Sequence, residues 1–173
     1  MSVVDKITDL ETFLAYSITL EEEAADQHEE LADTLQLHHN DEVGATFRKL
    51  ARYSRLHARD IRERGKGRAF PVIAPWDFGW EDATAPETAD IENVSYLMNT
   101  AQALQIAMGN EQRAHDFYDQ VSRESRIPEV AALAAEFAAE EQEHLDLLRE
   151  WMAKTESSVD EEIFDTDPVN SPE

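Results

Sequence analysis

The feature that most constrains the fold is a helical apolar period that recurs in four long stretches of the chain. In each stretch apolar side chains return every three or four residues, which places them along one face of an α-helix. The stretches run from about residue 8 to 37, 41 to 64, 100 to 123 and 128 to 154. Thr8 and Glu11 have capping-box spacing at the start of the first. The sequence therefore predicts four amphipathic helices, each of which must bury one face.

The connections predict how these helices are arranged. Short links at residues 38–40 and 125–127 make an antiparallel hairpin of each successive pair. The link between the hairpins, about residues 65–99, is too long for a turn. We expect it to cross the length of the bundle, so that the second and third helices run parallel. Three aromatic side chains in the crossover are expected to hold it against the bundle: Trp76, Phe78 and Trp80.

Composition limits the function. The 173 residues include no cysteine, which excludes disulfides, cysteine-ligated metals and thiol nucleophiles. A net charge of −23 argues against binding to nucleic acid or to an anionic membrane. No membrane span or signal peptide is readable, so we expect a cytoplasmic protein. Residues 1–154 are expected to form one all-α domain, followed by an acidic, disordered tail over 155–173.

The two hairpins resemble each other in sequence. Residues 21–28 (EEEAADQH) overlay 111–118 (EQRAHDFY), and residues 50–57 (LARYSRLH) overlay 137–144 (FAAEEQEH). The overlay pairs polar residues on the predicted inward faces, Glu21 with Glu111 and His57 with His144. One position does not match, because Ser54 stands opposite Glu141. The chain is thus predicted to use one structural unit twice, about a pseudo-twofold axis.

The first predicted helix, about residues 8–37, contains three consecutive glutamates. Glu21 shares its face with the apolar positions of this helix, whereas Glu22 and Glu23 are rotated by about 100° and 200° away from it. Glu21 is therefore the expected inward carboxylate.

Inward-facing carboxylates are costly unless they are paired or bind a cation. The spacing of Glu141 and His144 puts both side chains on one helical face, about 5–6 Å apart. Glutamate and histidine together suit iron, manganese or zinc. One glutamate from each of two helices, with Glu-x-x-His from the others, is the di-metal arrangement of ferritin-like bundles. Inward histidines and Glu–His pairs also occur as ordinary core residues, but the matched positions favour a metal site. The candidate ligands are Glu21, His57, Glu111, Glu141 and His144.

The chain resembles a rubrerythrin-type member of the ferritin-like superfamily over about residues 8–154. The segments that carry this resemblance are Glu111-x-x-Ala114-x-x-Phe117-Tyr118, Glu141-x-x-His144 and, more weakly, Glu21-x-x-Ala24 with LARYSRLH. The resemblance implies that Glu141 bridges two metal ions and that His57 and His144 each bind one. It also implies that Glu21 and Glu111 are terminal ligands.

Three departures from the family pattern affect these expectations. Without cysteine the chain lacks a rubredoxin module, His28 stands where the family often has tyrosine, and Ser54 stands where it has a bridging glutamate. Three carboxylates leave two divalent ions with a net charge of about +1, which favours an added anion. We expect an asymmetric site with the ion beside His144 better held. Asp60 and Glu140 are candidate substitutes for the missing carboxylate.

The resemblance implies two metal ions, with iron first and manganese or zinc as alternatives. It implies a rubrerythrin-like peroxidase or ferroxidase that reacts with peroxide or oxygen, takes electrons from an external donor and forms a homodimer. A second interpretation keeps the fold without the chemistry: a degenerate ferritin-like bundle that serves as a non-catalytic metal-binding or protein-interaction module.

Overall fold

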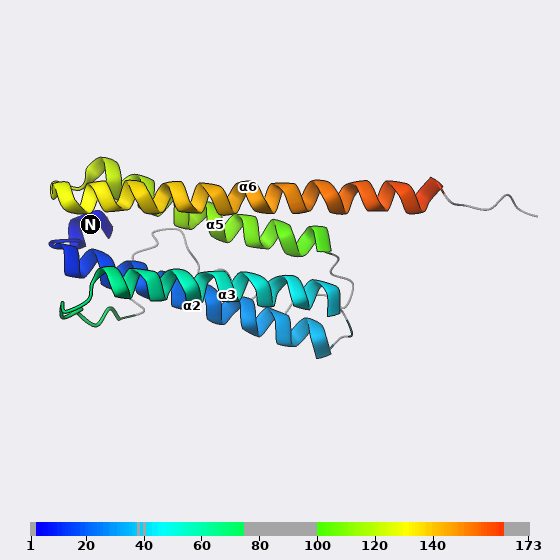
Figure 1. Ribbon diagram of the computed structural model, residues 1–173, viewed down its shortest axis with the longest axis horizontal. Coiled ribbons are helices and arrows are strands. Elements are labelled where there is room, and N and C mark those ends of the chain that lie inside the picture. Colours follow the sequence, from blue (N-terminus) through cyan, green and yellow to red (C-terminus); the bar gives the residue numbers. More distant parts are fainter. Residues whose placement is uncertain (1–2, 38, 40, 75–99, 165–173) are drawn as a thin grey trace, which may run out of the picture.

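The computed structural model describes residues 3–37, 39, 41–74 and 100–164. All regular secondary structure in these ranges is helical, as Figure 1 shows. The helices are α1 (Val3–Lys6), α2 (Leu10–Leu37), α3 (Asp41–Arg64), α5 (Thr100–Glu124) and α6 (Pro128–Phe164). The predicted all-α, ferritin-like four-helix bundle is confirmed, and α1 is a short addition to it.

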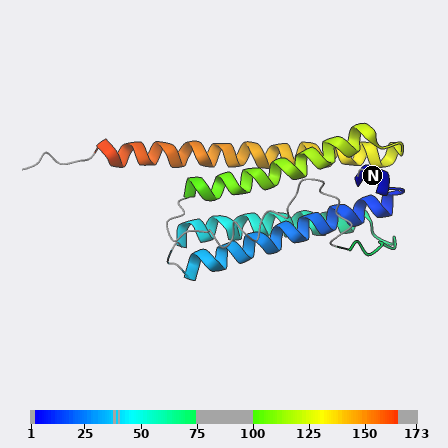
Figure 2. The ribbon, with the colours of Figure 1, turned by 180° about the vertical axis from the view of Figure 1, so that it is seen from behind.

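The long helices form two antiparallel hairpins, α2 with α3 and α5 with α6 (Figures 1 and 2). Helices α3 and α5 run in the same direction, so α3 ends at the opposite end of the bundle from the start of α5. This direction agrees with a connection that crosses the bundle length. The three aromatic residues expected to hold it lie outside the described residues.

The start of α2 differs from the prediction. Asp9 is the N-cap, because its Oδ1 accepts a 2.7 Å hydrogen bond from the backbone N–H of Thr12. The predicted capping box of Thr8 and Glu11 is therefore wrong. Thr8 donates instead to the carboxylate of Asp9, and Glu11 pairs with Arg68 at 2.6 Å. A carboxylate one residue further along is an equally good acceptor for the free N–H groups of the first turn.

The end of α6 also differs. The helix continues ten residues beyond Lys154, to Phe164, and projects past the other helices in Figure 1. The sequence predicted a disordered tail from residue 155, whereas α6 extends to Phe164; residues 165–173 lie outside the described ones. Neither glycine nor proline occurs between Pro128 and Pro168, so no residue of the helix-breaking types interrupts α6. No helix in the described ranges has the length and apolarity that crossing a bilayer requires.

The core consists of two apolar clusters. One lies toward the start of α2 and includes Phe13, Tyr118 and Phe137, whose rings pack at centroid distances of 5.4–6.2 Å. The other lies toward the end of α2 and includes Leu35 and Phe47. Along each long helix, the predicted metal ligands fall between the residues of one cluster and those of the other. The bundle thus places a polar layer between two apolar ones.

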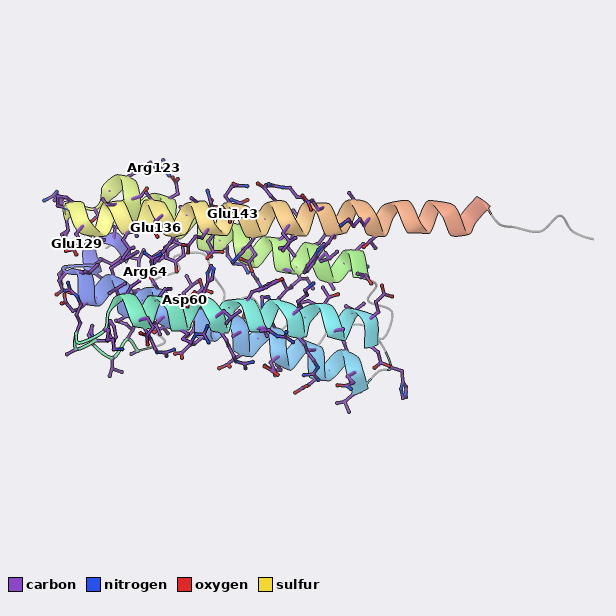
Figure 3. The ribbon with its side chains drawn as sticks, in the orientation of Figure 1. Asp60, Arg64, Arg123, Glu129, Glu136 and Glu143 are labelled. Carbon is purple, nitrogen blue, oxygen red and sulfur yellow. The ribbon has the colours of Figure 1, made fainter. Side chains whose placement is uncertain are left out.

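Ion pairs join the outer faces of the helices. Arg48 and Arg55 of α3 pair with acidic residues of α2, and Arg64 pairs with Glu136 of α6 (Figure 3). Exposed pairs of this kind stabilise a fold by at most about 1 kcal/mol each. They link α3 to α2 on one side and to α6 on the other.

Candidate metal centre

The five residues predicted as metal ligands meet in the polar layer. Glu21 comes from α2, His57 from α3, Glu111 from α5, and Glu141 and His144 from α6. The three glutamates are buried, whereas the side chains of the two histidines keep 20% and 25% of their surface exposed. The choice of Glu21 as the inward glutamate is confirmed, since the two glutamates that follow it are exposed.

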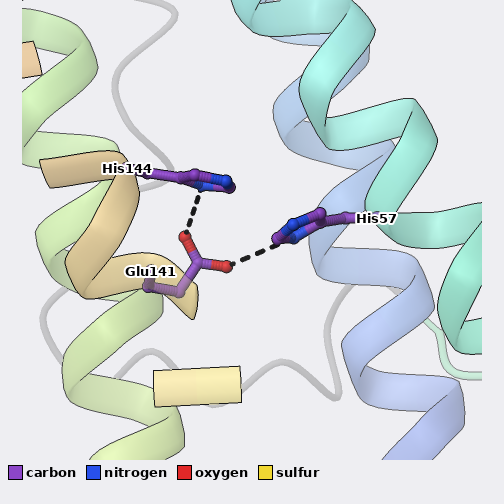
Figure 4. A group of neighbouring side chains, drawn as sticks. All are labelled: His57, Glu141 and His144. Carbon is purple, nitrogen blue, oxygen red and sulfur yellow. Dashed lines mark ion pairs between the residues drawn. The ribbon is translucent and has the colours of Figure 1, made fainter. Parts of the chain in front are cut away.

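The carboxylate of Glu141 faces both imidazoles, as Figure 4 shows. Its Oε1 is 3.8 Å from Nδ1 of His57, and its Oε2 is 3.3 Å from Nδ1 of His144. The two rings are 4.6 Å apart between centroids. These three residues each offer one ligand atom within 4.8 Å of the others, close enough to face a common ion.

A second glutamate accompanies each histidine. Glu21 Oε1 lies 3.7 Å from Nδ1 of His57, and Glu111 Oε2 lies 3.3 Å from Nδ1 of His144. The layer therefore contains two similar halves that share Glu141. The structure brings all five predicted residues together. Glu21 accompanies His57 as Glu111 accompanies His144, which agrees with the equivalence of these positions in the internal repeat.

Burial and mutual contact shift the pKa values of four groups in this layer. Burial raises the pKa of Glu21 to about 8, and the charge of Glu111 adds to the rise. Burial likewise raises the pKa of Glu141 well above its usual range. Burial opposes the charged form of His144, but hydrogen bonds to Glu111 and Glu141 outweigh it and raise its pKa to about 10. For Glu111, burial is outweighed by hydrogen bonds with His144 and Glu141, and its pKa is lowered.

The donor set fits a pair of divalent metal ions. Glu21 Oε1 is buried without a hydrogen-bond partner, so the protein alone leaves this oxygen unsatisfied. Bringing three carboxylates together in a buried layer is costly, and cations would offset that cost. Carboxylate oxygen and imidazole nitrogen are ligands that iron, manganese and zinc accept. Each half of the layer could hold one ion, through His57 with Glu21 and through His144 with Glu111, while Glu141 faces both.

Ser54 is buried beside this layer and lines a cavity of about 70 Å³. Glu21, Glu111 and Glu141 line the same cavity, so it contains the four positions that the repeat assigns to carboxylates. Sequence reasoning missed the polar residues at its rim, Gln27, Asn110, Arg113 and Glu23. Asn110 directly precedes Glu111 and is rotated by about 100° from it on an ideal helix, so the helical period gave no signal that it lines the same cavity.

The substitutes considered for the missing carboxylate do not occupy its place. Asp60 is exposed and lies 3.9 Å from Arg59, and Glu140 lies 3.7 Å from Arg64. His28 is fully buried, with its Nε2 3.4 Å from the amide nitrogen of Asn110.

Three further histidine and tyrosine side chains have other contacts. His115 lies 3.3 Å from its neighbour Asp116. Tyr118 belongs to the apolar core. Tyr53 stacks on His144 with ring centroids 6.3 Å apart.

Comparison with known proteins agrees with this geometry. The rubrerythrin family model matches residues 102–172. A solved structure of an uncharacterized conserved protein from Magnetospirillum magnetotacticum is 40% identical in sequence, with a TM-score of 0.68. The similarity covers 84% of this chain and 95% of that one. The chain belongs to the rubrerythrin family. Rubrerythrins generally bind a di-iron centre. None of the curated proteins matches the chain.

The two hairpins differ in how closely they follow the family. In this rubrerythrin the matched residues include Glu111, Glu141 and His144, whereas the hairpin with Ser54 and His57 lies before them. The departure from the family pattern is therefore concentrated in one half of the layer.

Proposed function

We propose that this rubrerythrin is a di-metal carboxylate protein, with iron as the metal, that reduces peroxide or oxidises Fe(II) with oxygen. The observation that carries the proposal is the meeting of Glu21, His57, Glu111, Glu141 and His144 in one buried layer between two apolar clusters. A pair of redox-active ions held there would supply electrons to an oxidising substrate.

The protein's own residues would have three tasks. His57 and His144 bring nitrogen donors from two helices, and the buried glutamates compensate the charge of the ions. The two apolar clusters keep bulk water away from the layer on both sides along the bundle. The partly exposed histidines leave the layer accessible to a small molecule from the surface of the bundle. The proposal includes an external electron donor and a homodimer, as the family resemblance suggests.

Metal analysis tests the proposal. Protein purified without chelator is loaded anaerobically with Fe(II), and bound iron is counted before and after exposure to peroxide or oxygen. We expect about two irons per chain that are oxidised faster than free Fe(II). Consumption of peroxide with a reductant would favour the peroxidase, and faster oxidation by oxygen would favour the ferroxidase.

A pair of variants makes the test specific. Glu141→Ala should weaken iron binding by at least about tenfold, since it removes a carboxylate that faces both histidines. Glu143→Ala, two residues away on the exposed face of α6, is the matched control and should bind iron like the wild type (Figure 3). Equal iron content in both variants would show that the site is assigned wrongly. One metal or none in the wild type, without redox turnover, would favour the non-catalytic module, for which Ser54 is the supporting observation.

A further inference from the structure

The cavity at Ser54 belongs to the proposed di-metal centre, because Glu21, Glu111 and Glu141 line it, and it extends beyond these ligands to Ser54. Its volume is about 70 Å³, whereas a cavity of about 10–15 Å³ is enough for one water molecule. The cavity can therefore hold a small molecule of a few heavy atoms. It reaches from the buried oxygens of Glu21, Glu111 and Glu141 to the exposed side chains of Glu23 and Arg113.

The internal repeat indicates which chemical group belongs in this space. Ser54 precedes His57 by three residues, as Glu141 precedes His144, so each side chain has the same helical displacement from its histidine. Glu141 faces both imidazoles, and Ser54 stands where the equivalent carboxylate of the other hairpin would be. A serine side chain is shorter than glutamate and leaves room where that carboxylate would extend.

Charge also favours an anion once metal is bound. Three carboxylates leave two divalent ions with a net charge of about +1. Among the described residues that line the cavity, Arg113 alone is cationic, and its guanidinium donates to the side-chain oxygen of Asn110 at the rim. Without metal the glutamates around the cavity repel an anion, so binding of the anion and of the metal should depend on each other.

We propose that this cavity binds a small carboxylate-type anion, such as formate, acetate or bicarbonate, which completes the metal centre in place of the glutamate missing at position 54. The inference rests on the proposed di-metal site but not on its redox activity. It makes the second metal ion, on the His57 side, dependent on an anion from solution. The proposal also limits the size of the anion, because an aromatic acid such as benzoate exceeds the available space.

Zinc binding tests the proposal without any redox turnover. Zinc per chain is measured by equilibrium dialysis at limiting free zinc, with formate, acetate, bicarbonate or benzoate added at constant ionic strength, and with chloride as the reference. For the wild type we expect one tightly bound zinc in chloride and a second that binds at least about tenfold more tightly with formate or bicarbonate. Benzoate should have no effect.

Two substitutions locate the anion. Ser54→Glu supplies the carboxylate covalently, so it should bind two zinc ions in chloride alone and lose its response to formate. Ser54→Ala keeps the cavity and should keep the response. If Ser54→Glu fails to fold, the wild type and Ser54→Ala decide between the outcomes by themselves.

Failure of the anion inference and failure of the proposed function give different results in this experiment. Two zinc ions bound equally tightly with and without small anions would overturn the inference, because water then completes the site, and would leave the proposed function standing. A formate response that persists in Ser54→Glu would place the anion elsewhere and overturn it as well. No zinc under any condition would overturn the proposed function together with the inference.

Discussion

Glu21→Gln in the metal-free protein gives the most direct test of the electrostatics of the polar layer. Glu21 is 4% exposed, and burial raises its pKa to about 8 from an ordinary value of 4.5. Glutamine has the shape of the protonated glutamate and cannot ionise. The substitution therefore removes one titration from the folded state while leaving the packing nearly unchanged.

The sign follows from proton binding. Between pH 4.5 and about 8 the folded protein keeps the proton on Glu21, whereas the unfolded chain has released it. Because the unfolded state then binds fewer protons, the free energy of unfolding falls as pH rises through this window. Each pH unit lowers the free energy of unfolding by at most about 1.4 kcal/mol. From pH 5 to pH 7.5 the wild type should lose about 3 kcal/mol more than the glutamine variant.

Urea unfolding followed by circular dichroism, in the presence of a chelator, measures this difference at several pH values. The titrations of the other groups in the layer, His144 among them, contribute to both proteins, and the comparison largely removes them. Glu22→Gln is the matched control, since Glu22 is exposed and pairs with Arg62 on the surface. Its stability should follow the wild-type pH curve. Parallel curves for wild type and Glu21→Gln across this window would refute the claim that burial keeps Glu21 protonated.

Two further predictions concern the helices. Asp9→Ala should destabilise the fold by about 1 kcal/mol in thermal unfolding, because it removes the N-cap of α2. Thr8→Ala should destabilise the fold less. A larger loss of stability in Thr8→Ala would show that Thr8 is the N-cap after all. Gly65→Ala should destabilise by about 1–3 kcal/mol, because its Cβ would overlap Phe70. Gly109→Ala is the matched comparison, since its Cβ meets only ordinary contact within α5 and should stabilise by up to about 1 kcal/mol; equal effects of the two glycine substitutions would contradict the packing described at Gly65.

Much of the fold was predictable because helical periodicity is a local property. The spacing of apolar residues predicted a helix over the range of α3 and the choice of Glu21 over its neighbours, and the structure agrees. The errors lie at helix ends, where several local solutions have similar free energy. Asp9 competes with Thr8 as the cap, and nothing in the sequence after Lys154 stops α6 until Pro168.

The sequence by itself determined which residues face inward and that two copies of one hairpin carry matching Glu and His positions. It also determined the missing carboxylate at Ser54, because the repeat can be compared with itself. The tertiary structure decided the rest, because distances between helices depend on how the hairpins pack. Only this packing brings Glu141 to face both His57 and His144, places Asn110 at the rim, and leaves a cavity beside Ser54. The period of apolar residues determines which face of a helix is buried. Enclosing a site needs four helices from distant parts of the chain.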